Sequence, residues 1–277
     1  MIIWISSYPK SGNTWVRYFL KSYFEPFDKK LTLKSTKLDD FYTLNFPNLP
    51  LLKELNIDYS NFANIIKNWI PMQSFINLNN RTNFCKTHNA MCTINNYPFT
   101  NKENTLGAIY IVRDPRDVVL SYANHLQLSH EETVERMFDS KNGEFQPGEK
   151  GEYNSTLTGS WSDNYNSWKS YKSSKILIIK YENLIDNSFI YFSKIIKYLS
   201  EISEVEYDEK KINQSIEKTA FDKLRSLEEK EGFEEKGLGK YFFRSGKKGS
   251  WRSQLDVNLS RKIRSRFKKE MDELNYI

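Results

Sequence analysis

Short apolar runs alternate with amphipathic stretches along this chain. The runs cover residues 2–6, 107–112 and 175–180, and residues 83–86 are a shorter strand candidate with two apolar residues at its centre. Continuous apolar runs of this length are typical of strands that are buried on both faces of a parallel sheet. We therefore predict four strands in these places.

Helical periodicity appears between and after these runs. We predict helices over residues 14–24, 115–126, 187–199, 209–223 and 259–274. The second has Asp114 as its N-cap and Pro115 in its first turn, a pair typical of helix starts. Strands that alternate with helices predict an α/β fold with a central parallel sheet flanked by helices.

Two stretches show no clear pattern. Residues 25–80 are rich in Asn, Leu, Phe and Pro and have only patchy periodicity, whereas residues 141–158 are polar and contain glycine. We expect the second stretch to be a mobile loop. Since neither a repeat nor a clear boundary appears, we predict a single domain over residues 1–277.

The charge balance suits an anionic ligand. The 277 residues include 41 basic and 35 acidic side chains, for a net charge of +6. Such an excess also suits nucleic acid or a membrane surface, but both signs are well mixed. No apolar run approaches the ~20 residues that span a membrane, and no basic segment precedes residues 2–5. We therefore expect neither membrane insertion nor a signal peptide.

The cysteines predict little special chemistry. Cys85 and Cys92 have no Cys/His set near them at zinc-ligand spacing, so we expect no metal site. Two reduced thiols in a cytoplasmic protein are the favoured interpretation.

The first predicted strand leads directly into a basic turn and a helix. Gly12 has no Cβ and lets a ligand approach the backbone. The helix that follows directs its free N–H groups and its positive dipole end at an anion. Lys10 and the hydroxyls of Ser11 and Thr14 add donors. The ordinary alternative is a buried strand and turn with a surface lysine.

The order of residues in this turn separates it from a Walker A loop, which ends in Gly-Lys-Ser/Thr. Here the lysine precedes the glycine. The sequence Tyr-Pro-Lys-Ser-Gly-x-Thr-Trp resembles the 5′-phosphosulfate loop of sulfotransferases that use 3′-phosphoadenosine 5′-phosphosulfate (PAPS). This resemblance implies that the donor contacts Lys10, Ser11, Gly12, Asn13, Thr14 and Trp15.

A second motif follows the third predicted strand. Arg113 stands at the carboxyl end of that strand, where open α/β sheets bind ligands, and its planar fork suits phosphate. By itself, Arg113 would more simply pair with Asp114 or Asp117. The segment is similar to the sulfotransferase motif Arg-x-Pro-x-Asp-x-x-x-Ser-Tyr, which implies that Arg113 and Ser121 bind the 3′-phosphate.

A third motif, Lys86-Thr87-His88, ends the second predicted strand. Histidine takes up a proton near neutral pH, as activation of an alcohol requires. A hydrogen-bonded histidine at a strand end is the ordinary alternative. The triplet resembles the catalytic-base strand of cytosolic-type sulfotransferases, which implies that His88 is the general base.

A fourth motif lies in the basic, glycine-containing segment 243–252, which could wrap a phosphate or serve as a solvated linker. It resembles the late Arg-Lys-Gly-x-x-Gly-Asp-Trp-Lys motif of the family. Arg244 and Gly246 match that motif, whereas Ser245 replaces the lysine and Ser250 the aspartate. The resemblance implies donor contacts at Arg244, Ser245 and Gly246.

Weaker similarities follow the family order. Gly159-Ser160-Trp161 and Trp168 resemble a segment before the family's fourth strand, and Tyr181 resembles a tyrosine beside the adenine. Trp15 and Phe221 match aromatic residues that stack on it. Core packing is the common role of each such aromatic residue taken alone.

Together these motifs predict a PAPS-dependent sulfotransferase that acts on a hydroxyl, or less readily an amine, of a small-molecule, glycan or lipid acceptor. By this resemblance His88 removes the acceptor proton, Lys10 and Lys86 neutralise charge, and Ser121 holds Lys10 back until the acceptor binds. Lysines and helix N–H groups replace a metal. We expect the acceptor pocket to draw on residues 25–80 and 141–158. The alternatives are a nucleotide kinase-like phosphate-loop enzyme and a basic nucleic-acid-binding protein.

Overall fold

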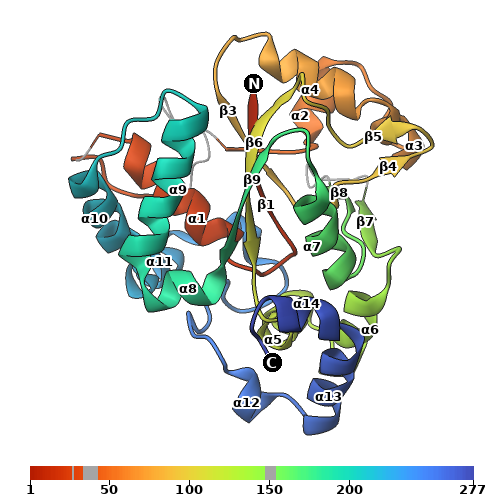
Figure 1. Ribbon diagram of the computed structural model, residues 1–277, viewed down its shortest axis with the longest axis vertical. Helices are drawn as coiled ribbons and strands as arrows, with labels where there is room; N and C mark the ends of the chain where they lie inside the picture. The colour runs from red at the N-terminus through yellow and green to blue at the C-terminus, as the bar shows by residue number, and fades with distance from the viewer. Residues whose placement is uncertain (27, 34–42, 147–153) are drawn as a thin grey trace. The chain divides into compact units, whose positions relative to one another are not determined.

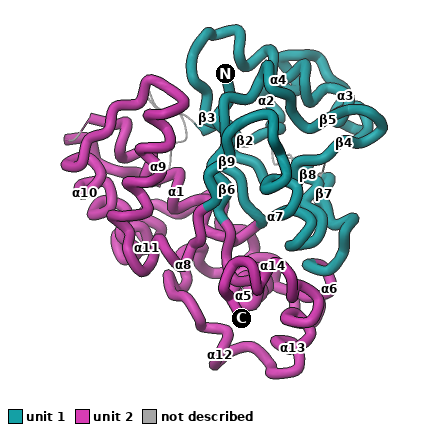
Figure 2. Tube along the Cα trace, viewed as in Figure 1, with its two compact units in different colours: residues 1–8, 43–111, 137–178 teal, residues 9–42, 112–136, 179–277 magenta. Residues whose placement is uncertain are grey.

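The computed structural model describes residues 1–26, 28–33, 43–146 and 154–277. The chain forms two compact units, each made of several stretches (Figure 2). Unit 1 contains residues 1–8, 43–111 and 137–178. Unit 2 contains residues 9–42, 112–136 and 179–277. A single domain over residues 1–277 therefore stays a prediction.

A five-stranded sheet forms the centre of unit 1 (Figure 1). Its strands are β1 (Ile2–Ser7), β2 (Thr43–Asn45), β3 (Asn83–Thr87), β6 (Thr105–Val112) and β9 (Lys175–Lys180), of which β6 and β9 end within unit 2. The strand order is β2-β3-β1-β6-β9. β1 runs parallel to both β3 and β6, and β2 runs parallel to β3. The four predicted strands and the α/β class are confirmed. The edge strand β2 was not predicted because its three residues, Thr43, Leu44 and Asn45, make no apolar run.

Three parallel strands end level with one another. Ser6 of β1 is paired with Thr87 of β3, and Ser7 of β1 with Ile111 of β6. The carboxyl edge of a parallel sheet is where α/β proteins bind ligands. The phosphate loop, His88 and the Arg113 segment each continue the chain from this edge.

The rest of unit 1 consists of helices and two antiparallel hairpins. The helices are α2 (Leu49–Glu54), α3 (Phe62–Lys67), α4 (Trp69–Asn77) and α7 (Trp161–Ser170). The hairpins pair β4 (Thr93–Ile94) with β5 (Tyr97–Pro98), and β7 (Gly143–Gln146) with β8 (Asn154–Leu157). The prediction of a loop over residues 141–158 is therefore wrong at both ends, where polar residues form ladder pairs. Residues 147–153 lie outside the described chain.

Aromatic side chains fill much of the core of unit 1. The ring of Phe99 lies 5.1 Å from Trp4 of β1, 5.3 Å from Trp69 of α4 and 6.2 Å from Trp168 of α7, measured between centroids. All four residues are completely buried. Since one aromatic ring buries 150–250 Å², an aromatic share of 15% supports a substantial core despite the modest hydrophobic share of 39%.

Unit 2 is mainly helical. Its helices are α1 (Asn13–Phe24), α5 (Pro115–Leu126), α6 (His130–Phe138, whose last two residues belong to unit 1), α8 (Tyr181–Asp186), α9 (Ser188–Ile202), α10 (Glu209–Lys218), α11 (Phe221–Glu231), α12 (Trp251–Gln254), α13 (Val257–Arg266), α14 (Lys268–Glu273) and the 3-10 turn η1 (Glu234–Lys236). Phe19 of α1 stacks on Phe192 of α9 with centroids 3.9 Å apart. Within the described ranges, no helix is long and apolar enough to cross a membrane.

Two predicted helices are each divided in the structure. The predicted helix 209–223 is broken between α10 and α11, where Ala220 has non-helical backbone angles (φ −55°, ψ 143°) and the Thr219 hydroxyl donates to the Ser215 carbonyl. The predicted helix 259–274 is broken at Phe267 between α13 and α14. In both cases the apolar spacing continues across a short turn, so periodicity alone did not reveal the break.

Candidate functional site

The loop between β1 and α1 has an unusual backbone. Lys10 has φ 65° and Gly12 has φ 105°, both in the left-handed region. A non-glycine residue there carries strain, which tends to occur at functional sites. A Cβ on Gly12 would lie 2.5 Å from the ring of Tyr181. Gly12 is therefore required both by its backbone angle and by the ring beside it.

This loop presents polar groups at the start of α1. Ser11 is completely buried, and its hydroxyl has no hydrogen-bond partner within the described ranges. A buried hydroxyl without a partner is costly, and an anion at the helix N-terminus would satisfy it. Asn13 accepts a hydrogen bond from Nε of Arg17 at 3.0 Å. These residues fit the phosphate group that the sequence predicts.

An ion pair that the sequence did not predict lies beside this loop. Nη2 of Arg17 contacts both carboxylate oxygens of Glu235 at 2.7 and 2.6 Å. The two side chains are only 6% and 22% exposed. The hydroxyl of Thr14 also donates to Glu235, over 3.4 Å. A carboxylate thus lies next to a predicted phosphate ligand. No sequence signal relates two positions so far apart.

Arg113 connects three of the predicted segments. Its Nη1 donates to the main-chain oxygen of Lys10 over 3.2 Å, and its Nη2 donates to that of Lys247 over 3.1 Å. The guanidinium carbon lies 4.4 Å above the ring of Tyr181. The first loop, the basic segment 243–252 and the residue predicted beside the adenine therefore all contact Arg113.

Asp117 of α5 forms hydrogen bonds with the basic segment 243–252. Its carboxylate accepts from the N–H groups of Gly249 and Trp251 over 2.5 and 3.0 Å. Arg116 adds a contact, because its guanidinium carbon lies 3.7 Å above the ring of Trp251. Asp117 stands at the Asp position of the motif Arg-x-Pro-x-Asp-x-x-x-Ser-Tyr, but the sequence analysis gave it a role only as an alternative partner of Arg113. Its position between two motif residues, Arg113 and Ser121, was the available signal.

The remaining predicted residues of the basic segment differ in exposure. Arg244 is exposed, whereas Ser245 is half-buried. Gly246 has φ 60°, and a Cβ there would overlap the ring of Phe221. The close approach of backbone and ring explains why glycine stands at this position.

The predicted adenine-binding rings lie in one part of unit 2. Trp15 contacts Tyr181 and Phe192 edge-on, with centroids 6.1 and 5.3 Å apart. Trp15 and Phe221 both pack, partly buried, against the cluster of Tyr18, Leu33, Leu224 and Phe243. Each ring therefore also has a packing role, which was the alternative interpretation.

The residue after Tyr181 holds that part of the site in place. The Glu182 carboxylate accepts from the Asp114 N–H over 2.9 Å and from the Tyr276 hydroxyl over 2.8 Å. Burial raises the pKa of Glu182 above its usual value. Glu182 thereby connects the start of α8 to the start of α5.

The ammonium group of Lys10 contacts an aromatic ring. Its Nζ lies 3.6 Å from the centroid of Phe242, a favourable cation–π geometry. Ser121 lies on the second turn of α5 and is half-buried. The proposed control of Lys10 by Ser121 stays a prediction.

His88 lies in unit 1, directly after β3. Its Nδ1 is 2.8 Å from the main-chain oxygen of Ser7 and 3.4 Å from the Ser7 hydroxyl. A carbonyl oxygen can only accept, so Nδ1 carries the proton and Nε2 is the basic nitrogen of the neutral ring. Lys86 is the second-last residue of β3 and is half-buried.

The predicted site residues therefore fall into two groups. Lys86 and His88 belong to unit 1. Unit 2 contains Lys10, Ser11, Gly12, Asn13, Thr14, Trp15, Arg113, Ser121, Tyr181, Phe221, Arg244, Ser245 and Gly246. Across the part of the chain that the structure describes, no three His, Cys, Asp or Glu side chains could together hold a metal ion. The individual roles of these residues stay predictions.

Two sulfotransferases align with nearly the whole of this chain. Sulfotransferase 1 family member D1 of Mus musculus is 24% identical, with 98% of this chain and 83% of the relative covered. Sulfotransferase 1B1 of Canis lupus familiaris is 24% identical, with 96% and 82% covered.

Solved structures share the fold. Mouse sulfotransferase SULT7A1, complexed with adenosine 3′,5′-bisphosphate (PAP), has a TM-score of 0.59 at 19% identity. The match covers 98% of this chain and 84% of that chain. Retinol dehydratase in complex with retinol and PAP has a TM-score of 0.62 at 19% identity, with 98% and 81% covered.

The sulfotransferase domain family matches residues 2–275, which is nearly the whole sequence. This match confirms the family that the motifs predicted and does not favour the kinase-like or nucleic-acid-binding alternatives. The chain belongs to the sulfotransferase domain family.

Proposed function

We propose that this protein transfers a sulfuryl group from PAPS to a hydroxyl group, or less readily an amine, of a small-molecule acceptor. The observation that carries the proposal is the position of Arg113, which contacts the main chain of Lys10, that of Lys247 and the ring of Tyr181. The family resemblance assigns these three segments to one nucleotide, and the guanidinium group of Arg113 contacts all three.

The residues of unit 2 fit the donor. PAPS, when bound, supplies the sulfuryl group and leaves as adenosine 3′,5′-bisphosphate (PAP). The first turn of α1, with the orphan Ser11 hydroxyl, offers donors to the 5′-phosphate. Arg113 and Ser121 bind the 3′-phosphate, assisted by the loop at residues 244–246. Trp15, Tyr181 and Phe221 bind the adenine.

Proton removal falls to His88. Its Nδ1–H is directed at the Ser7 carbonyl, so Nε2 takes the acceptor's proton. Lys10 stabilises charge on the leaving phosphate oxygen, and Lys86 neutralises the sulfuryl oxygens. Lys10 must leave the ring of Phe242 to do so, while Ser121 restrains it until the acceptor is present.

The acceptor provides the hydroxyl that receives the sulfuryl group. Retinol dehydratase has been solved in complex with androsterone and with retinol, so a lipid-like alcohol is one class to test, with glycans as another. Residues 25–80 and 141–158 are the proposed acceptor segments, although residues 27, 34–42 and 147–153 lie outside the described chain. A cytoplasmic location and the absence of metal, nucleic-acid and membrane partners also stay predictions.

The direct test is transfer of ³⁵S from labelled PAPS to a panel of alcohols, phenols, amines and glycans. Lys10→Ala should lower the rate with any accepted compound by about 10²-fold or more, the usual cost of removing one preorganised transition-state donor. Lys210→Ala, an exposed lysine of α10 outside the proposed donor and acceptor segments, is the matched control. A loss below about threefold for Lys10→Ala would remove Lys10 from the mechanism.

A binding assay separates the alternatives. PAP should bind with an affinity that random DNA cannot match, whereas a nucleic-acid-binding protein would bind any polyanion with steep salt dependence. The absence of PAP binding at millimolar ligand, together with no labelled product, would refute the proposed function.

A further inference from the structure

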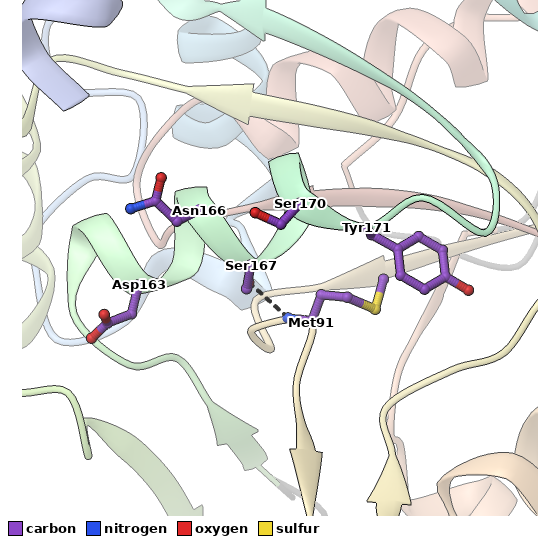
Figure 3. Close-up of a pocket in the computed structure, with 6 residues that line it drawn as sticks. All are labelled: Met91, Asp163, Asn166, Ser167, Ser170 and Tyr171. Atoms are coloured by element: carbon purple, nitrogen blue, oxygen red, sulfur yellow. Dashed lines mark hydrogen bonds between the residues drawn. The ribbon is translucent and has the colours of Figure 1, made fainter. Parts of the chain in front are cut away.

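Three side chains on one face of α7 hydrogen-bond the main chain directly after β3. Nδ2 of Asn164 donates to the carbonyl of His88 over 3.0 Å. Nε1 of Trp168 donates to the carbonyl of Asn89 over 2.9 Å. The Ser167 hydroxyl accepts from the N–H of Met91 over 2.9 Å, as Figure 3 shows. The spacing i, i+3, i+4 places all three side chains on one face of the helix.

Both ends of the Asn164 side-chain amide form hydrogen bonds. It is completely buried, and its Nδ2 also donates to the carbonyl of Thr158 over 2.8 Å. Its Oδ1 accepts from the hydroxyl of Tyr110 over 2.8 Å. The carbonyls of His88 and Thr158 can only accept, so the amide has one possible orientation. The buried amide therefore fixes the His88 carbonyl in a single direction.

α7 is itself held in place at both ends. At its start, the Ser160 hydroxyl accepts from the Asp163 N–H over 3.1 Å, while Asp163 accepts from the Ser160 N–H over 3.3 Å. This capping box pairs two N–H groups at the helix start. At its end, Trp168 stacks on Tyr110 in the aromatic core with centroids 6.2 Å apart. The face of α7 is thus a rigid support for the chain after β3.

His88 is held from two directions within unit 1. Its carbonyl is bound by Asn164, and its ring Nδ1 donates to the carbonyl of Ser7. We propose that Asn164, supported by Ser167 and Trp168, is a positioning residue that fixes His88 with the proton on Nδ1 and the basic lone pair on Nε2. This inference rests on the proposed role of His88 as the general base. It also gives a physical reason for Ser160 and Trp168, two positions of the Gly-Ser-Trp…Trp segment that the donor site does not use.

The test compares Asn164→Ala with the wild type and with Ser170→Ala. Ser170 lies on the same helix, is exposed, and lines the nearby surface pocket without taking part in the three contacts (Figure 3). The protein contains three histidines, so the side-chain ¹⁵N NMR signals can be assigned by single substitutions. We expect a pure Nδ1–H tautomer for His88 in the wild type and in Ser170→Ala, and a mixture of both tautomers in Asn164→Ala.

Turnover provides a second measurement. Misplacing a catalytic group by about 1 Å can cost about 100-fold, so Asn164→Ala should lower kcat by about 10- to 100-fold. The KM for PAPS and the Kd for PAP should stay within about twofold of the wild type, since Asn164 does not serve the donor. Trp168→Phe, which removes the N–H donor together with the five-membered part of the indole and leaves an aromatic ring in place, should give the same tautomer mixture with a smaller loss of kcat. It also keeps the test available should Asn164→Ala fail to fold.

The outcomes distinguish this inference from the proposed function. If both variants fold and retain the wild-type tautomer and kcat, Asn164 does not position His88 and the inference is overturned. A tautomer change with loss of kcat supports it. If the wild type transfers no sulfuryl group but the tautomer changes as expected, the proposed function fails while the positioning of the His88 ring by α7 stands.

Discussion

Arg113 and Lys10 are joined by a hydrogen bond from Nη1 of the arginine to the main-chain oxygen of the lysine, 3.2 Å long. The carbonyl belongs to a residue with φ 65°, so the arginine supports a strained turn. The residue predicted to bind the 3′-phosphate therefore also shapes the loop predicted to bind the 5′-phosphate.

Arg113→Ala should weaken PAP binding more than it weakens binding of adenosine 5′-phosphate. A charge-assisted hydrogen bond contributes about 1.5–3 kcal/mol, or about 10- to 150-fold in affinity. Arg113→Lys keeps the charge without the planar fork and should recover only part of the loss. Calorimetry with both nucleotides is the measurement. Equal losses for the two would mean that Arg113 does not read the 3′-phosphate.

His88→Ala should abolish catalysis and leave PAP binding nearly unchanged, because the base serves the acceptor. Loss of a general base usually costs about 10²–10⁴-fold. His88→Gln keeps a hydrogen-bonding side chain that cannot take up the proton, so it should be nearly as inactive. Wild-type turnover should fall at acid pH as the imidazole becomes protonated. Near-normal single-turnover transfer by either variant would direct the search for the base to a carboxylate.

Gly246→Ala should destabilise the protein more than Gly232→Ala. Both glycines have positive φ, but a Cβ on Gly246 would overlap the Phe221 ring, whereas nothing lies within 4 Å of one on Gly232. Both variants carry backbone strain, and only the first adds overpacking, expected to cost about 1–3 kcal/mol more. Urea unfolding measures the difference. In a Phe221→Ala background, Gly246→Ala should no longer cost more unfolding free energy than Gly232→Ala. If the difference between the two variants is unchanged in that background, the contact with the ring is contradicted.

Glu235→Gln should strengthen PAP binding at low salt. The carboxylate lies 3.4 Å from the hydroxyl of Thr14, and a negative charge near a bound phosphate costs on the order of 1 kcal/mol, about fivefold in affinity. The gain should shrink as salt is added. Glu234→Gln, an exposed neighbour in η1, is the matched control. Equal effects of the two variants would show that the pairing with Arg17 and Thr14 is not specific.

Thiol labelling should be slow in the native protein and strongly dependent on pH. Burial raises the pKa of Cys92 to about 11, so only about one thousandth of it is thiolate at pH 8, and its rate should rise about tenfold per pH unit below that pKa. Burial raises the pKa of Cys85 further still, and that thiol is completely buried. Reaction with Ellman's reagent tests this, with the guanidinium-unfolded chain as control. Rapid native labelling at pH 7 would contradict it.

The sequence determined the features that depend on neighbouring residues. Apolar runs marked β1, β6 and β9, and a shorter apolar pair marked β3. The run of β6 is buried along nearly its whole length, because a strand covered on both faces needs consecutive apolar side chains. Asp114 and Pro115 marked the start of α5, where the Asp114 side chain accepts from the Arg116 N–H. The roles predicted for the turn at Lys10 to Thr14 and for the His88 triplet also came from a few consecutive residues, through their resemblance to sulfotransferase motifs.

Tertiary structure decided the features that depend on contacts between residues far apart in the sequence. The contacts of Asp117 with Gly249, of Glu235 with Arg17 and of Asn164 with His88 join residues separated by 76 to 218 positions. Likewise, polar residues became β7 and β8 because they pair with each other, and the breaks at Ala220 and Phe267 interrupt patterns that remain periodic across them. Such pairings form when packing brings the groups within reach, since hydrogen bonds and ion pairs act over a few ångströms of space regardless of separation along the chain.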